Sequence, residues 1–247
     1  MIENVLDNAS CKLKDTHPNL HRWKSWQPNT PFAPIFDLPL WMEDLNPWFI
    51  EDLCQLIVDR DEGNIDNEVV DNVVKPYGLN YEKRWKNYNI FNWEDKSIQF
   101  LRASIWRVYN DYMESLGLSI EENLWIRGWA VRMNKGEYLS LHSHSFHENT
   151  YLSGNLMVSN HKTTTDYAIP HLSTYYGFYK VENKPARITL FPSWVQHKVD
   201  SIDENDRISI GFDLFTFDTM EYISKQRQEN PEFRDPIMHS IPLVKSE

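Results

Sequence analysis

The sequence has few cysteines, no long apolar run and no excess of basic residues, and each shortage excludes a class of protein. Only Cys11 and Cys54 occur among 247 residues, so neither a disulfide framework nor zinc-finger spacing is available. No apolar run approaches the roughly 18 residues that a membrane-spanning helix needs. The net charge of −11 argues against general nucleic-acid binding, which requires a basic surface.

The N-terminal residues, MIENVLDNASCKLKD, also lack the charged-then-apolar layout of a signal peptide. Free cysteines suit a reducing compartment. Together these absences predict a cytoplasmic protein.

The composition is that of a globular chain with an aromatic core. Hydrophobic residues make up 41% and aromatic residues 14% of the sequence, and ten residues are tryptophan. Large aromatic side chains favour a packed interior and a walled pocket over a disordered chain. The length fits one domain with additions, or at most two domains.

The first half of the chain carries helical patterns. Residues 1–30 are polar and predict a loose extension. The proline-punctuated stretch 31–41 predicts an edge strand or an extended arm, because proline cannot donate a ladder hydrogen bond. Apolar residues at helical spacing predict two helices. The first runs over about 47–60, begins at Pro47 and is ended by Gly63, and the second runs over about 96–116 and is ended by Gly117. The basic and aromatic stretch 81–89 could bind single-stranded nucleic acid, but a solvated surface fits the acidic total better.

The second half changes to short strands, which predict a sandwich or a jelly roll. A Thr- and Tyr-rich loop over about 160–184 is expected to cover a pocket, and His161 and His171 lie in it. Asp218 is expected to cap a helix over about 219–229, with an irregular tail beyond Pro231. Strands are expected over about 125–133, 138–144, 151–159, 186–191, 198–199 and 207–217.

The stretch from Gly136 to Gly154 holds the strongest pattern. On a strand, alternate side chains share a face, so Tyr138, Ser140, His142 and His144 would face one side, opposite Leu139 and Leu141. The two histidines would then lie about 6.5 Å apart along the strand, close enough to converge on one metal ion. His197, at the end of an apolar run, is the expected third ligand, although such histidine pairs also arise by chance.

These residues resemble the 2-oxoglutarate/Fe(II)-dependent dioxygenase superfamily, and within it a poorly characterised branch. The resemblance runs from about Phe32 to Phe217. It implies a mainly β protein with flanking helices, whose double-stranded β-helix (jelly-roll) core is packed by N-terminal helices. The matching positions are Gly136, Tyr138, His142, His144, Ser153, Gly154, Phe191, Pro192, His197, Arg207 and Ser209.

The implied domain boundaries follow from this resemblance. Residues 1–30 would be an N-terminal extension, and residues 31–217 the dioxygenase domain. That domain would have a helical part over about 47–117 and a jelly-roll core over about 122–217. Residues 218–247 would form a C-terminal helix and tail.

The resemblance also implies a ligand set and cofactors. His142, His144 and His197 would bind Fe(II), with 2-oxoglutarate as co-substrate and O2 as oxidant. The commonest triad of the superfamily has Asp or Glu where His144 stands. The third ligand could therefore be a carboxylate instead, from Glu137, Glu148 or Asp166, or a water or halide, and His147 competes with His144.

Arg207 is expected to bind the far carboxylate of 2-oxoglutarate, with Ser209 donating one more hydrogen bond and Tyr138 assisting. The alternative for Arg207 is a surface salt bridge with Asp203 or Asp206. In isolation that alternative would be favoured, but the offset of Arg207 from His197 matches the superfamily.

The function implied is oxidative decarboxylation of 2-oxoglutarate coupled to hydroxylation of a substrate. A protein side chain and a small molecule are both open as substrates, and nucleic acid is the least favoured. One alternative is a three-histidine, cupin-like oxygenase that needs no 2-oxoglutarate. Another is a metal-binding structural or interaction domain.

Overall fold

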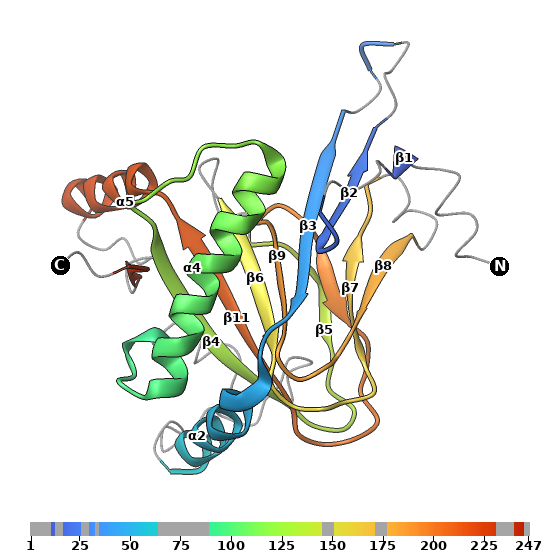
Figure 1. Cartoon of the computed structure of the whole chain (residues 1–247), viewed down its shortest axis with the longest axis vertical. Coiled ribbons are helices and arrows are strands. Elements are labelled where there is room, and N and C mark those ends of the chain that lie inside the picture. Colours follow the sequence, from blue (N-terminus) through green and yellow to red (C-terminus); the bar gives the residue numbers. More distant parts are fainter. Residues whose placement is uncertain are drawn as a thin grey trace.

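Two antiparallel sheets and a layer of helices form the architecture in a computed structural model of the chain (Figure 1). The structure describes residues 11–12, 17–25, 30–32, 35–63, 89–144, 151–170, 177–230 and 240–244. The main sheet has eight strands in the order β1-β2-β3-β9-β6-β11-β4-β12, and the smaller sheet has four in the order β5-β10-β7-β8. The mainly β architecture with flanking helices, as predicted from the sequence, is confirmed.

The main sheet combines strands from both ends of the chain. Its strands are β1 (Cys11–Lys12), β2 (Leu20–Lys24), β3 (Asp37–Asp44), β4 (Trp125–Met133), β6 (Leu152–Met157), β9 (Arg187–Pro192), β11 (Arg207–Phe215) and β12 (Ile241–Pro242). The smaller sheet consists of β5 (Leu139–His142), β7 (Thr164–Ala168), β8 (Phe178–Glu182) and β10 (His197–Val199). The helices are η1 (Pro47–Phe49), α2 (Ile50–Gly63), η2 (Ile90–Asn92), α4 (Lys96–Leu116) and α5 (Phe217–Glu229).

Helix α4 lies across one face of the main sheet, with α2 beside it (Figure 1). Its apolar stripe, including Leu101, Ile105 and Val108, is fully buried in the largest hydrophobic cluster together with residues of β6, β9 and β11. Gly117 ends the helix in the left-handed region at φ 67°, a conformation that glycine adopts without steric cost. The predicted helix over 96–116 is therefore confirmed, and so is its stop at Gly117.

Strand β11 shows how one strand serves the core and the interior of the sandwich at once. Ile208, Ile210, Phe212 and Leu214 belong to the cluster under the helices. The alternate residues Arg207, Ser209 and Asp213 are buried on the opposite face, between the sheets. Because side chains alternate along the strand, its apolar residues face the helices and its polar residues face the space between the two sheets.

A second hydrophobic cluster joins the two sheets. It combines Leu38, Leu40 and Phe191 of the main sheet with Tyr167 and Val181 of the smaller one. Because the cluster takes residues from both sheets, their inner faces pack directly against each other near β7 and β9.

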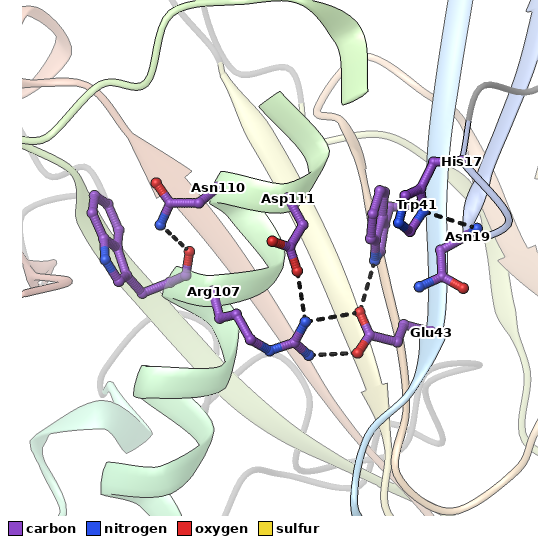
Figure 2. A network of polar contacts seen from close by, with 8 residues as sticks. His17, Asn19, Trp41, Glu43, Arg107, Asn110 and Asp111 are labelled. Atoms are coloured by element: carbon purple, nitrogen blue, oxygen red, sulfur yellow. Dashed lines mark hydrogen bonds and ion pairs between the residues drawn. The ribbon is translucent and has the colours of Figure 1, made fainter. Parts of the chain in front are cut away.

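A polar network fixes α4 against β3 on the outside of the molecule (Figure 2). Arg107 of α4 donates to both carboxylate oxygens of Glu43 and also to Asp111. The indole Nε1 of Trp41 donates to Glu43 at 3.2 Å, and the Trp41 ring stacks on His17 at 4.6 Å. The helix layer is therefore attached to the sheet by charge as well as by apolar packing.

The N-terminal part of the chain differs from its prediction. Leu20–Lys24, expected in a loose extension, forms strand β2 and pairs with β3, so that prediction is wrong for these residues. A domain boundary at residue 31 would therefore separate β2 from the rest of the main sheet. Strand β3 is not an edge strand along its whole length, because its second half also pairs with β9. Pro39 lies in the first half, which pairs with β2 alone. A proline is tolerated there because one side of the strand has no ladder to complete.

Two predictions near the C-terminus need correction. The N-cap of α5 is Thr216, whose hydroxyl accepts from the Thr219 N–H, and Asp218 lies in the first turn instead. Within the tail, Ile241 pairs with Ile126 of β4, so the tail is not irregular throughout.

The expected pocket-covering loop over 160–184 is also wrong for the residues described. This stretch supplies β7 and β8, which pair with each other and form half of the smaller sheet. The composition was misleading because β7 turns polar side chains, Thr165 among them, toward the interior. His161 is buried there, while His171 lies outside the described residues, as do His147, Glu148 and residues 81–88.

Candidate functional site

Three histidines, two on neighbouring strands and one just beyond the end of β5, meet between the sheets. His142 on β5 is the direct cross-strand partner of His197 on β10, and their ring centroids lie 4.4 Å apart. His144 follows two residues after the end of β5, and its ring lies 5.4 Å from His142 and 5.0 Å from His197. One nitrogen from each ring lies within 4.8 Å of the other two, a spacing at which all three can bind one metal ion.

The path of β5 differs from the predicted alternation at one point. His142 pairs with His197 and Leu139 pairs with Val199, so β5 has one extra residue between these pairs. Such a bulge shifts the alternation, and Leu139 consequently faces the same side as His142 instead of the opposite side. Leu139 packs on the cluster that contains Val199. Tyr138, just before the strand, is 40% exposed, so a contact between Tyr138 and a co-substrate stays a prediction that this placement does not support.

The hydrogen bonds of the histidines fix which nitrogen faces the common centre. Nδ1 of His142 lies 2.7 Å from the Ser140 carbonyl oxygen, and Nδ1 of His197 lies 3.1 Å from that of Val195. Nδ1 of His144 lies 2.6 Å from Oδ1 of Asp213. Carbonyl and carboxylate oxygens accept hydrogen bonds, so each Nδ1 carries the proton and each Nε2 carries the lone pair that binds a metal.

Burial keeps two of these imidazoles neutral. Burial, reinforced by the neighbouring His144, lowers the pKa of His142 to about 4. Burial also holds the pKa of His197 well below its ordinary value. A neutral imidazole is the form that binds metal, so this pair is prepared for a cation without first losing protons.

Asp213 is a site residue that the sequence analysis missed. It lies fully buried on β11, directly opposite Arg127 of β4 and Ser153 of β6. Burial would raise the pKa of Asp213, but His144, Arg127 and Ser153 together hold it below its ordinary value. A signal was present, because Asp213 continues the period-two series of Arg207 and Ser209 along an otherwise apolar strand.

Two of the three carboxylates considered as alternative ligands, Glu137 and Asp166, lie elsewhere. Glu137 accepts from the backbone N–H of Asn134 within the turn before β5. Asp166 accepts from the Thr164 hydroxyl and pairs with Lys180 at 3.0 Å. Neither belongs to the group of three histidines.

Arg207, at the start of β11, has 0% of its surface exposed. Its guanidinium donates to the hydroxyls of Thr163, Thr165 and Ser209, each at 3.2 Å, and contacts the sulfur atoms of two methionines. Among the residues described, no carboxylate forms an ion pair with it. Burial consequently lowers the pKa of Arg207 to about 10.

The surface salt bridge weighed as an alternative for Arg207 is not formed. Asp206 pairs instead with Arg132, at 2.6 Å, on the outside of the sheet. A buried guanidinium without a carboxylate partner is costly unless an anion binds beside it. The environment of Arg207 therefore fits an anion-binding pocket.

Tyr167 of β7 links the two halves of the site. Its ring lies 5.8 Å from that of His197, and its hydroxyl is hydrogen-bonded to Thr189 at 2.7 Å. Tyr167 also interacts electrostatically with Arg207. Tyr167 of β7 therefore lies beside His197 and close enough to Arg207 to interact with its charge.

Comparison with known proteins agrees with this geometry. Residues 127–213 match a family model described as putative 2OG-Fe(II) oxygenase, and this match contains the three histidines and Arg207. Residues 127–213 of the chain are therefore similar to this oxygenase family. A search of curated proteins finds no match.

Solved structures of two prolyl hydroxylases show the same fold. A prolyl-4-hydroxylase from Pseudomonas putida matches with a TM-score of 0.50 at 14% identity, covering 72% of this chain and 87% of its own. A prolyl hydroxylase from Trichoplax adhaerens, in complex with a peptide fragment of hypoxia inducible factor, matches with a TM-score of 0.52 at 11% identity. In that match 77% of this chain and 86% of the other are covered. The predicted double-stranded β-helix core is thereby confirmed.

The donor set of the chain fits the cofactors that the matched family model implies. Three imidazole Nε2 atoms suit Fe(II), and a buried arginine ringed by hydroxyls suits the free carboxylate of 2-oxoglutarate. None of the described helices is long and apolar enough to cross a membrane.

Proposed function

We propose that this protein is a 2-oxoglutarate-dependent Fe(II) dioxygenase that hydroxylates an as yet unidentified substrate. When bound, iron and 2-oxoglutarate supply the oxidising chemistry, in which O2 and 2-oxoglutarate give succinate, CO2 and one oxygen atom for the substrate. In this proposal His142, His144 and His197 hold the iron through Nε2. Arg207 and Ser209 hold the far carboxylate of 2-oxoglutarate.

The environment of Arg207 carries the proposal. A three-histidine oxygenase that needs no 2-oxoglutarate, or a structural metal domain, has no use for a buried cation such as Arg207. A dicarboxylate co-substrate needs both a metal and a cation, one at each end. The contacts of Arg207 with Thr165 and of His197 with Tyr167, both on β7, support this arrangement.

The residues around Arg207 have separate tasks in this scheme. The hydroxyls of Thr163, Thr165 and Ser209 accept from the guanidinium and so fix the plane of its fork before any ligand arrives. Ser209, which accepts from Arg207, can still donate its own proton to a carboxylate oxygen. Burial of Arg207 and Tyr167 excludes water, which strengthens the interaction between the cation and the carboxylate.

A direct assay tests the proposal. The purified protein is loaded with Fe(II) and 2-oxoglutarate under nitrogen, and the charge-transfer band of the chelate is sought in the visible spectrum. Oxygen is then admitted and succinate is quantified. We expect both signals for the wild type and for Arg132→Met, which removes a surface arginine, and neither signal for Arg207→Met at the same concentration of 2-oxoglutarate.

The alternatives give other results in this assay. Oxygen uptake without succinate would indicate a three-histidine oxygenase that uses no 2-oxoglutarate. A bound metal with neither band nor succinate would indicate a structural metal site.

The substrate class is open between a protein side chain and a small molecule. A peptide is a reasonable first candidate because the Trichoplax adhaerens enzyme was captured with a peptide. A screen that compares peptides with a metabolite extract, reading the mass gain of one oxygen atom, tests hydroxylation itself. An oxidised product without that mass gain would replace hydroxylation by another oxidation.

A further inference from the structure

The three histidines do not have equivalent partners. His142 and His197 donate through Nδ1 to neutral backbone carbonyl oxygens. His144 alone among the three donates to a carboxylate, Oδ1 of Asp213, at 2.6 Å. His144 is also the residue that stands where the commonest triad of the superfamily has a carboxylate ligand. The negative charge missing from the ligand set is thus present one imidazole ring away.

We propose that Asp213 is the positioning residue of His144 and supplies, through its imidazole, the negative charge that the three-histidine metal site lacks. This inference rests on the ligand set of the proposed function. A carboxylate that accepts the Nδ1 proton draws it away from the ring, which makes Nε2 a stronger donor toward a metal. His144 then takes over electrostatically the part of a carboxylate ligand.

The strands hold Asp213 in place for this task. Arg127, Asp213 and Ser153 are direct cross-strand neighbours on β4, β11 and β6 and face the interior together. The Ser153 hydroxyl donates to Oδ1 of Asp213 at 2.7 Å, and Arg127 lies 3.6 Å from Oδ2. The carboxylate is therefore fixed from both sides by rigid strands, and its oxygen has little freedom to leave His144.

His144 needs this support more than the other two histidines do. It lies beyond the end of β5, so no sheet ladder fixes its backbone. Instead its N–H donates to the carbonyl of Ser193, and the hydroxyls of Ser193 and Ser153 are hydrogen-bonded at 2.9 Å. His144, Asp213, Ser153 and Ser193 consequently form a closed ring that holds both the main chain and the side chain of His144.

Anaerobic titration of the full-length protein with Co(II), without 2-oxoglutarate, tests the proposal. Asp213→Asn keeps the shape of the side chain and removes its charge, and we expect it to weaken Co(II) binding about 10- to 100-fold. Ser153→Ala removes one hydrogen bond to Asp213 but keeps the charge, and we expect less than about a threefold loss. In His144→Ala, adding Asp213→Asn should cause no further loss, because the two residues act as one unit.

A spectroscopic signal separates this role from a merely structural one. In the Co(II) protein the Nδ1 protons of the bound histidines give shifted NMR resonances. Asp213→Asn should move one of these strongly and leave the other two nearly in place. Equal small changes in all three, or wild-type Co(II) affinity in Asp213→Asn, would overturn the proposal.

Asp213→Asn also removes the carboxylate that Arg127 faces, and this could disturb folding. The double variant Arg127→Met with Asp213→Asn removes both charges and keeps the interior neutral. We expect its Co(II) affinity to stay as low as that of Asp213→Asn. Recovery of wild-type affinity would show that Arg127 caused the loss and would reject the role of Asp213.

The titration is independent of turnover. If the wild type releases no succinate but Asp213→Asn still weakens Co(II) binding, the role of Asp213 is supported and the proposed oxygenase activity is rejected. If the wild type binds no Co(II), the role proposed for Asp213 is rejected.

Discussion

His142 and His197 are direct cross-strand partners on β5 and β10, and their rings lie 4.4 Å apart. Residues opposite each other in a sheet point to the same face, so the pairing brings together ligands that are 55 positions apart, as their numbers show. Arg207 lies on the other sheet, across the interior. The sandwich itself therefore sets the separation between the candidate metal site and the candidate anion site.

Replacing Arg207 by methionine should stabilise the ligand-free protein while abolishing co-substrate binding. The guanidinium is buried and, among the described residues, has no carboxylate partner. Replacing a buried charge by an apolar side chain of similar volume can add about 1–4 kcal/mol of stability. We expect Arg207→Met to raise Tm, measured by calorimetry, and to lose the further rise that 2-oxoglutarate gives the wild type.

Arg132→Met is the matched control, because Arg132 pairs with Asp206 at the surface. It should leave both the Tm and its response to 2-oxoglutarate within experimental error of the wild type. A lower Tm in Arg207→Met than in Arg132→Met would mean that the buried arginine supports the fold and is no anion site.

Gly154 should tolerate no side chain unless Phe212 becomes smaller. A Cβ at Gly154 would lie 2.1 Å from the ring of Phe212, its cross-strand partner on β11. Overpacking of this kind costs about 1–3 kcal/mol, so Gly154→Ala should lower the urea midpoint accordingly.

Combining Gly154→Ala with Phe212→Leu tests that contact directly. The second substitution frees the space that the new methyl group needs, so the double variant should be more stable than the sum of the two single losses predicts. If the losses of stability in the two single variants simply add, the cost of Gly154→Ala does not come from its contact with Phe212.

Asp44 should contribute to stability in the acid range. Hydrogen bonds from Arg187, and then from Lys184, lower the pKa of Asp44 to about 2. The unfolded chain has the ordinary, higher value, so this contribution is complete above about pH 4 and disappears as the pH falls through about 2. Because Asp44 is partly exposed, we expect about 1 kcal/mol or less.

The measurement is urea unfolding of Asp44→Asn at several pH values. The variant should be less stable than the wild type near pH 5 and equal to it near pH 2. Asp203→Asn, an exposed position in the turn before β11, serves as the control. If the difference in unfolding free energy between Asp44→Asn and the wild type does not change with pH, the charge of the Asp44 carboxylate is not its cause.

The sequence predicted those elements whose apolar residues face the helix layer. Helix α4 has the expected bounds because one clear face of it is buried in a continuous apolar cluster, and strand β4 because apolar residues on both of its faces are buried. Strand β7 escaped prediction because Thr165 and Asp166 are polar although both are buried. Composition suggests a loop in such a case, although the strand is buried.

Within the site, sequence spacing found the three histidines and Arg207, but not what surrounds them. The bulge in β5 depends on cross-strand register, which no local pattern encodes. The alternation along β11 places Asp213 on the same face as Arg207 and Ser209, but that pattern does not show which groups surround it. Arg127 and Ser153 approach it from strands far away in the sequence.

His144→Asp should be a poor substitute on its own and a better one with Asp213→Asn. The single substitution restores a two-histidine, one-carboxylate triad, but the new carboxylate lies near Asp213 and cannot donate the proton that Asp213 now accepts at 2.6 Å. Two buried carboxylates repel each other, and one of them would take up a proton. Asp213→Asn removes this repulsion and offers an amide that can donate to the new carboxylate. We therefore expect Fe(II) content and succinate release to fall in His144→Asp, to recover at least partly in the double variant, and to stay lowest in His144→Ala. Equal, near-wild-type values for His144→Ala and His144→Asp would show that His144 is no metal ligand.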